Sequence, residues 1–285
     1  MVPQEGGARA YFDFAGNVEL DKSSITVCRR FLGWANFFFD QDSKLANRGV
    51  GEVASLVASG LRLDYSQSNL SLAWHDFVNN ANWQHGDVFV NLLQTIVMAF
   101  VGTLFAAEVA TPLIFPAART ITPSPLVNHA FKRFFDFQRC VDIFIWALFF
   151  TRGFGPGPLA GIAAIYFTDI DKLGKTNTEA LENIDNKQRE GVRSLGASPL
   201  QVKRFGVLLQ VLPVFVSQAL YQWENNRSAT IIGAMGTGGI GPKLLESMRT
   251  DFNWANVTYM VALILVVVYV FDNLSAWLRR RIQSA

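Results

Sequence analysis

Apolar residues are concentrated in the C-terminal two thirds of the chain, and this uneven distribution restricts the folds it can adopt. Residues 88–115 are almost wholly apolar, interrupted by Asn91, Gln94 and Glu108. A run of this kind is long enough to cross a bilayer as a helix, which needs about 20 residues. Further apolar blocks follow at residues 134–141 and 143–150, which are taken together as one span, and at residues 159–167, 205–223 and 258–271. We therefore expect an all-α polytopic membrane protein with five core transmembrane helices.

Composition supports a membrane protein and excludes several other classes. Hydrophobic residues make up 50% of the chain, and 24 Phe and 7 Trp exceed what a soluble core of this size needs. The formal net charge is only +2, which argues against a nucleic-acid binder. Two distant cysteines and three isolated histidines match neither a disulfide scaffold nor a metal site. We expect no catalytic residues and no metal ligands.

The first 87 residues form a separate N-terminal region whose structure the sequence leaves open. Its best apolar stretch, residues 25–39, is interrupted by Arg29 and Arg30. It fits equally well an amphipathic surface helix and a weak membrane span, which would be a sixth. No basic start, apolar stretch and cleavage site of a signal peptide is visible here. We assign residues 88–285 to the transmembrane domain.

Turn residues and basic residues predict how the spans are connected. Residues 134–141 and 143–150 form the first arm of a predicted helical hairpin, and residues 159–167 form the second. The Gly- and Pro-rich residues 151–158 make the turn between them. Basic residues cluster at 119–133, 172–204 and 279–281, which places these segments in the cytoplasm. The turn and residues 227–254 then face outward.

The cytoplasmic loop 171–204 contains the most informative local pattern. A helix is predicted to break at Gly196 and to restart with Ser198 as N-cap and Pro199 at the first helical position. The second helix then runs into the membrane. An ordinary polar loop would not explain this whole spacing.

This stretch resembles the EAA signature of ABC importer permeases. Glu190 and Gly196 occupy its acidic and glycine positions, and Leu212-Pro213 closes it. Gly191 and Val192 replace the usual alanines. Leu209 replaces an earlier proline, which predicts a straighter helix entry. The resemblance implies a type I ABC importer permease fold and assigns ATPase coupling to Glu190, Ser194, Gly196, Ala197, Ser198 and Pro199.

In that family the loop forms a coupling helix that docks on a separate ATPase subunit. The chain has no Gly-x-x-x-x-Gly-Lys-Ser/Thr motif with which to bind nucleotide phosphates. The resemblance therefore implies no cofactor in this chain, with ATP and Mg on the partner ATPase. One set of spans and no internal repeat predict a homodimer in membrane lipid. Two ATPase subunits and a periplasmic or lipoprotein substrate-binding protein would complete it.

A second block resembles the phosphonate permease (PhnE type). Residues 224–241, residues 155–161 and the Asp272-Asn-Leu-Ser sequence contain the resemblance. Gly236 to Gly241 also matches a dinucleotide-binding pattern, but it lies between membrane spans rather than between a strand and a helix. The simpler interpretation of this glycine-rich segment is a flexible outer loop. We favour a gate or pore segment at the outward mouth, comprising Glu224, Arg227, Met235, Gly236, Thr237, Gly238, Gly239 and Gly241.

Ionisable residues at membrane depth need a partner or a water-filled path. Glu224 and Arg227, three residues apart, are predicted to pair with each other. Glu108 and Asp142 have no obvious partner in the sequence, and they face either a pore or another span.

Together these features predict a multi-pass inner-membrane permease that imports a phosphonate or a related oxyanion, such as phosphate or phosphite, by alternating access. A permease for another small solute is an alternative. Two others are a membrane-embedded enzyme, for which no converging cluster of His, Asp or Ser is visible, and a structural membrane subunit.

Overall fold

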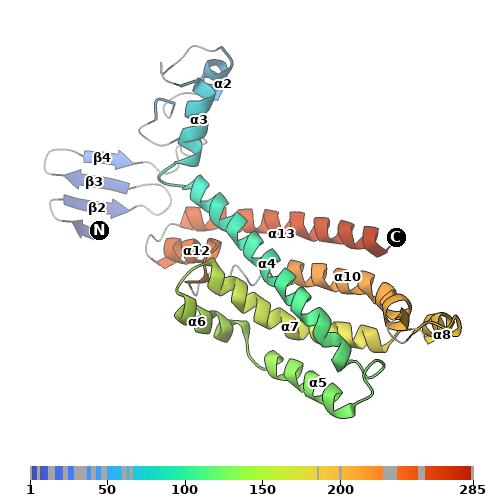
Figure 1. Ribbon diagram of the computed structural model, residues 1–285. Helices are drawn as coiled ribbons and strands as arrows, with labels where there is room; N and C mark the ends of the chain where they lie inside the picture. Colours follow the sequence, from blue (N-terminus) through green and yellow to red (C-terminus); the bar gives the residue numbers. More distant parts are fainter. Residues whose placement is uncertain are drawn as a thin grey trace. The chain divides into compact units, whose positions relative to one another are not determined.

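The computed structural model describes residues 2–4, 7–11, 17–21, 25–28, 37–39, 43–45, 50–59, 63, 67–184, 186–198, 201–226, 236–249 and 254–283. The chain forms two compact units (Figure 1). The first contains Met1–Val90 and Ser247–Met260, and the second contains Asn91–Glu246 and Val261–Ala285.

The first unit begins with a four-stranded antiparallel sheet in the order β1-β2-β3-β4. Its strands are β1 (Val2–Gln4), β2 (Gly7–Tyr11), β3 (Asn17–Asp21) and β4 (Ile25–Cys28). Neighbouring strands are joined by short connections, as in a β-meander. The sequence analysis did not predict this sheet. Since Ile25–Cys28 is a strand, the helical interpretation of residues 25–39 is wrong at this end, and residues 29–36 lie outside the described residues.

Two short helices follow, α2 (Val50–Ser59) and α3 (Asn69–Val78). Phe39, Leu45 and Val53 form a small buried cluster in this part of the unit. His85 is also fully buried, with its Nε2 atom 2.7 Å from the Phe37 carbonyl oxygen and its Nδ1 atom 2.7 Å from the Tyr259 hydroxyl. Because a carbonyl only accepts, Nε2 donates to it. His85 is thus a core histidine with both ring nitrogens bonded.

The second unit is helical, and the all-α permease fold predicted for residues 88–285 is confirmed there. It contains most of α4, α12 and α13, together with the other elements between α4 and α13 (Figure 1). Their bounds are α4 (His85–Ala117), α5 (Pro125–Arg139), α6 (Ile143–Phe154), α7 (Pro158–Glu182), α8 (Asn186–Ser194), the π-helix η2 (Val202–Leu208), α10 (Leu209–Asn225), α12 (Ile240–Arg249) and α13 (Trp254–Gln283).

Helix α7 makes buried contacts with several other helices of this unit. One apolar cluster joins it to α4 and α6, and a second joins it to α4 and α5. A third joins its C-terminal end to α4 and α10. The three clusters contain many alanines, which allow helices to approach closely where lipid offers no hydrophobic driving force. The buried alanines are Ala99, Ala106, Ala110, Ala117, Ala118, Ala147, Ala160 and Ala164.

Three of the described helices are long and apolar enough to cross a membrane, namely α4, the segment Phe205–Asn225 and α13. The other predicted spans correspond to α6, which is apolar but only 12 residues long, and to the first half of α7. The predicted continuous first arm of the hairpin is wrong. The Asp142 carboxylate accepts a hydrogen bond from Phe144 N (2.9 Å) and starts α6 as a new helix after α5 has ended.

Gly102 tests how much the fold depends on the close approach of α4 to α7. A Cβ at this position would lie 2.7 Å from Ile165 Cγ2 and 3.1 Å from the Ile162 carbonyl oxygen. We expect Gly102→Ala to destabilise the protein by about 1–3 kcal/mol through overpacking, despite the better helix propensity of alanine. Thermal unfolding of the purified protein in detergent measures this.

Gly153→Ala is the matched control, because a Cβ at Gly153 in α6 meets nothing within 4 Å. It should leave the unfolding temperature unchanged or raise it. Equal unfolding temperatures for the two variants would contradict the close packing of α4 on α7.

Candidate functional site

The polar loop between α7 and α10 has the predicted helix, break and restart. Helix α8 (Asn186–Ser194) ends at an exposed turn, in which Gly196 N donates to the Arg193 carbonyl oxygen (3.0 Å). Gly196 has a φ of +77°, a left-handed conformation typical of the glycine that ends a helix. Leu195 beside it is 86% exposed, an unusual environment for a large apolar side chain.

The restart is held by a reciprocal cap. Ser198 N donates to Gln201 Oε1 (2.8 Å), and Gln201 N donates to Ser198 Oγ (3.5 Å). This pairing is a capping box. The predicted N-cap role of Ser198 is therefore confirmed, whereas Pro199 lies outside the described residues.

The second helix enters the membrane domain through η2 and α10. The residues before Leu209 form a seven-residue π-helix, so the straighter entry predicted from the missing proline is not observed. Pro213 lies inside α10 and removes a further helical hydrogen bond. This irregular backbone separates the loop from the regular part of α10.

The glycine-rich segment packs against other helices of its own unit. The Gly236 carbonyl accepts from Gly157 N (2.9 Å), and Gly239 N donates to Gln94 Oε1 (3.1 Å). A Cβ on Gly239 would lie 2.5 Å from Thr95 Oγ1. The glycines are thus required for close approach within the chain. Arg227 and Met235 lie outside the described residues.

Thr237 and Gly238 show the same packing. Thr237 is fully buried, and its carbonyl oxygen would lie 3.0 Å from a Cβ on Gly161. A Cβ on Gly238 would lie 3.0 Å from Pro158 N. Gly241, further along in α12, is buried as well.

Glu224 forms an ion pair with Arg279, while the predicted pairing with Arg227 stays a prediction because Arg227 lies outside the described residues. The Oε2 atom of Glu224 lies 2.8 Å from Nη2 of Arg279 in α13, and both side chains are largely buried. The topology derived from the sequence places Glu224 near the outward end of a span and Arg279 in the cytoplasmic tail. The ion pair instead requires Glu224 and Arg279 to lie at the same depth in the membrane domain.

The other two unassigned carboxylates have different environments. Asp142 is the N-cap of α6 rather than a pore residue. Glu108 is exposed on α4.

A buried polar cluster joins α4, α7 and the end of α10. Asp169 is 0% exposed, and its Oδ2 atom accepts from Thr103 Oγ1 (2.9 Å) and Asn226 Nδ2 (2.7 Å). Its Oδ1 atom accepts from Gln222 Nε2 (3.0 Å) and lies 3.6 Å from Lys172 Nζ. Thr103 is close to the midpoint of the 33-residue helix α4.

This cluster was not predicted from the sequence, because the apolar block was taken to end at residue 167 and Asp169 was not considered as a buried residue. Helix α7 in fact continues to Glu182, and Asp169 is one of its buried residues. A carboxylate only two residues beyond the apolar block 159–167 was the available signal.

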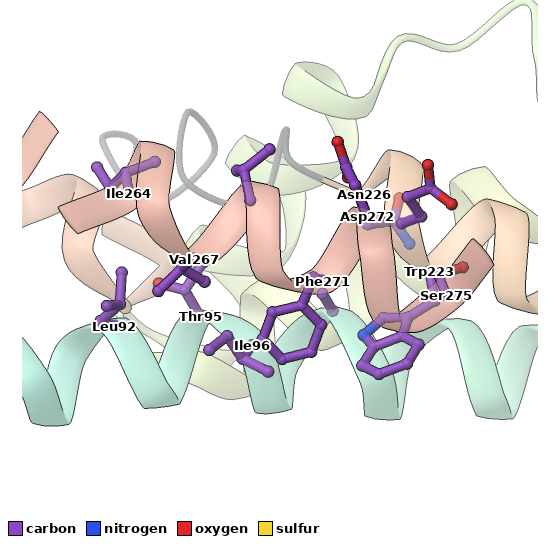
Figure 2. A pocket seen from close by; sticks show the side chains of 13 residues that line it. Leu92, Thr95, Ile96, Trp223, Asn226, Ile264, Val267, Phe271, Asp272 and Ser275 are labelled. Atoms are coloured by element: carbon purple, nitrogen blue, oxygen red, sulfur yellow. The ribbon is translucent and has the colours of Figure 1, made fainter. Parts of the chain in front are cut away.

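A cavity of about 70 Å³ lies between α4, α10 and α13 (Figure 2). Leu92 and Ile96 of α4 and Val267 and Phe271 of α13 form apolar walls. Polar groups gather at one end, where Figure 2 shows Asn226, Asp272 and Ser275. The cavity is thus amphipathic.

A charged pocket of about 350 Å³ lies where α4 ends and α5 and α7 meet. Glu182, at the C-terminal end of α7, accepts from Lys132 Nζ (2.8 Å) and Arg119 N (2.9 Å). Burial raises the pKa of Glu182, but these hydrogen bonds and charges together lower it below its usual value. The described residues contain no group of three or more His, Cys, Asp or Glu that could hold a metal ion.

Comparison with known proteins identifies the family. Residues 110–284 match the binding-protein-dependent transport system inner membrane component family. The chain belongs to this family and is a multi-pass inner-membrane protein. It is 35% identical over 190 residues to the phosphite transport system permease protein PtxC of Stutzerimonas stutzeri, covering 66% of this chain and 69% of that protein. It is 34% identical to the phosphate-import permease protein PhnE of Mycolicibacterium smegmatis, covering 69% of this chain and 37% of that protein.

Solved structures share the fold. A chain of the MetNI methionine ABC transporter in an inward-facing conformation aligns with a TM-score of 0.61 at 20% identity, covering 68% of this chain and 96% of that one. A chain of an amino acid ABC transporter aligns with a TM-score of 0.58 at 14% identity, covering 68% and 93%. These alignments confirm the type I importer permease fold predicted from the sequence.

The Glu182 contacts predict a specific dependence of stability on pH. A carboxylate with a lowered folded-state pKa stabilises the protein above its unfolded pKa of about 4.3, and this contribution is lost as the pH falls through the folded value. We expect Glu182→Gln to lower the free energy of unfolding by about 1 kcal/mol at pH 7. The difference between the variant and the wild type should shrink as the pH falls below about 4 and Glu182 begins to bind a proton.

Unfolding in detergent, measured at pH 7 and pH 3.5, tests this. Glu179→Gln, which removes a carboxylate one turn earlier in α7, serves as the control and should show a smaller difference at pH 7. A Glu182→Gln effect of the same size at both pH values would contradict the assignment.

Proposed function

We propose that this chain is the membrane subunit of an ATP-driven importer for phosphonate or a related oxyanion, such as phosphite or phosphate. The relatives named as phosphite and phosphate-import permeases support this substrate class. A curated protein named as a putative cryptic phosphonate transport system permease in Escherichia coli is 40% identical over 118 residues, covering 41% of this chain and 96% of that protein. The same proposal includes transport by alternating access.

The exposed turn after α8 is the part of the chain to which we assign coupling to the ATPase. Leu195 and Gly196 project from the loop, and a Cβ on Gly196 would meet nothing within 4 Å. The turn therefore leaves an apolar side chain and open space accessible to a partner protein. We assign this role to Glu190, Ser194, Gly196, Ala197, Ser198 and Pro199.

The partners follow from this assignment. Two copies of the chain in membrane lipid would form the pore, and two ATPase subunits would bind ATP and Mg and hydrolyse the nucleotide. A substrate-binding protein would deliver the oxyanion. This chain itself would supply neither a catalytic residue nor a cofactor.

The gate is proposed at the glycine-rich segment. Gly236, Gly238 and Gly239 have positive φ values, and they lie against the end of α6, the start of α7 and α4, respectively. Close backbone packing of this kind can switch between two discrete arrangements, as a gate requires. Glu224, Arg227, Met235, Thr237 and Gly241 complete the proposed segment.

Gly196→Asp tests the coupling role. The new side chain would be strained at φ +77° and would add a charge to the docking surface, so we expect import to fall by about tenfold or more. Glu190→Ala should act in the same direction. Membrane insertion should be unchanged, because neither residue lies in a span.

Gly191→Ala is the matched control, because a Cβ at Gly191 also meets nothing within 4 Å and alanine is the usual residue of the signature there. Import assays and co-purification of the ATPase read out all three variants. If Gly196→Asp and Glu190→Ala both import at the wild-type rate with the ATPase bound, the coupling assignment is wrong.

A further inference from the structure

The carboxylate of Asp169 receives hydrogen bonds from two other helices inside the membrane domain. One donor, Thr103, is on α4, while Gln222 and Asn226 come from α10 and the residue that follows it. Asn226 Nδ2 also lies 2.5 Å from Thr103 Oγ1, which closes the cluster. All four side chains are buried. The cluster is therefore a direct polar link between α4, α7 and α10.

The position of α10 determines how well this buried charge is stabilised. A buried carboxylate is costly unless its oxygens accept enough hydrogen bonds, and bonds to a charged group are stronger than neutral ones. Of the three side-chain hydrogen bonds that Asp169 accepts within the described residues, two come from the amides of Gln222 and Asn226. Lys172, whose Nζ atom lies 3.6 Å from Asp169 Oδ1, is nearly half exposed. A displacement of α10 would thus remove most of the stabilisation of Asp169.

Helix α10 is also the helix that the proposed coupling loop enters. The capping box of Ser198 and Gln201 leads into η2, which continues directly into α10. Residues 227–235, which follow Asn226, lie outside the described residues, and the glycine-rich segment begins at Gly236. A π-helix often marks a functional site, and here it lies between the loop and the clustered amides. From Val202 onward, one continuous helical element therefore leads to the amides that bind Asp169.

Asn226 connects the cluster to the cavity of Figure 2. Its amide nitrogen is occupied by Thr103 and Asp169, so the orientation of the amide is fixed. Its Oδ1 atom is buried and has no hydrogen-bond partner within the described part of the chain. The link to Asp169 thus also determines which group Asn226 presents beside the cavity.

We propose that Asp169 is a positioning residue for transport, which holds α10 in one register against α4 and α7. Movement of the coupling loop would release Gln222 and Asn226 from the carboxylate and so move the glycine-rich segment that follows. This inference rests on the proposed function, because it needs an ATPase acting on the loop. The proposed role of Asp169 is therefore in transport and is separate from any contribution of this carboxylate to the stability of the fold.

A charge-exchange cycle tests the proposal. Gln222→Glu places a second carboxylate against Asp169, and the two repel. In the double variant Asp169→Asn with Gln222→Glu, the new amide oxygen can accept from Thr103 and Asn226, while the new amide nitrogen donates to the carboxylate introduced on α10. The double variant therefore restores every hydrogen bond with the charge on the other helix.

The variants are compared in proteoliposomes at pH 8 by phosphonate import, ATP hydrolysis and unfolding temperature. For Gln222→Glu we expect import per ATP to fall about tenfold while hydrolysis stays within about twofold of wild type. The double variant should recover import per ATP to within about threefold of wild type. Asp171→Asn, which removes a carboxylate from the same helix outside the cluster, should leave import per ATP unchanged.

Each alternative result has a distinct meaning. Unchanged import per ATP in Gln222→Glu, or no recovery in the double variant, would overturn the positioning role. So would parallel losses of import, hydrolysis and unfolding temperature, which indicate a structural role only. A wild-type protein that imports no phosphonate, phosphite or phosphate would instead refute the proposed function and, with it, the role of Asp169 in transport.

Discussion

Close approach of α7 to its neighbours is the constraint on which the rest of the membrane domain depends. Lipid is as apolar as the helix surfaces, so association relies on tight packing and on hydrogen bonds between helices. Gly102 brings α4 close to Ile165, and Gly174 brings α7 against the ring of Phe135. With the backbones this close, the short side chains of Thr103 and Asp169 can reach each other. The apolar packing and the buried polar cluster are thus consequences of the same small residues.

The described elements suggest how a signal from the cytoplasm could travel. The exposed turn at Leu195 and Gly196 precedes η2, which continues into α10, and Asn226, the residue after α10, lines the cavity. The glycine-rich segment then packs on α4 and the start of α7. The described parts of this route are helices and tight contacts, and residues 199–200 and 227–235 between them lie outside the described residues.

Sequence reasoning predicted the features that depend on local pattern. The long span α4, the break at Gly196 and the cap at Ser198 all follow from hydropathy, backbone conformation or capping chemistry. The N-terminal sheet was missed because residues 25–39 show an apolar stretch broken by arginines, without clear strand alternation. The separation of α5 from α6 was missed because the N-cap role of Asp142 was not recognised.

The partners of the buried charges could not be read from the sequence, because they are set by tertiary packing. The carboxylate of Glu224 pairs with Arg279, which is more than fifty residues away on another helix and which no local spacing indicates. Likewise, Asp169 is separated by more than fifty residues from the amides of Gln222 and Asn226. Local spacing identifies possible pairs, and only the fold decides between them.

The most direct test of the account is uptake into proteoliposomes that contain this chain and its ATPase. We predict that labelled phosphonate, phosphite or phosphate accumulates only with ATP on the ATPase side and the substrate-binding protein on the other. Omitting the ATPase, the ATP or the substrate-binding protein should abolish uptake. Uptake without ATP or without the binding protein, or ATP-driven uptake of another solute but none of these oxyanions, would contradict the account.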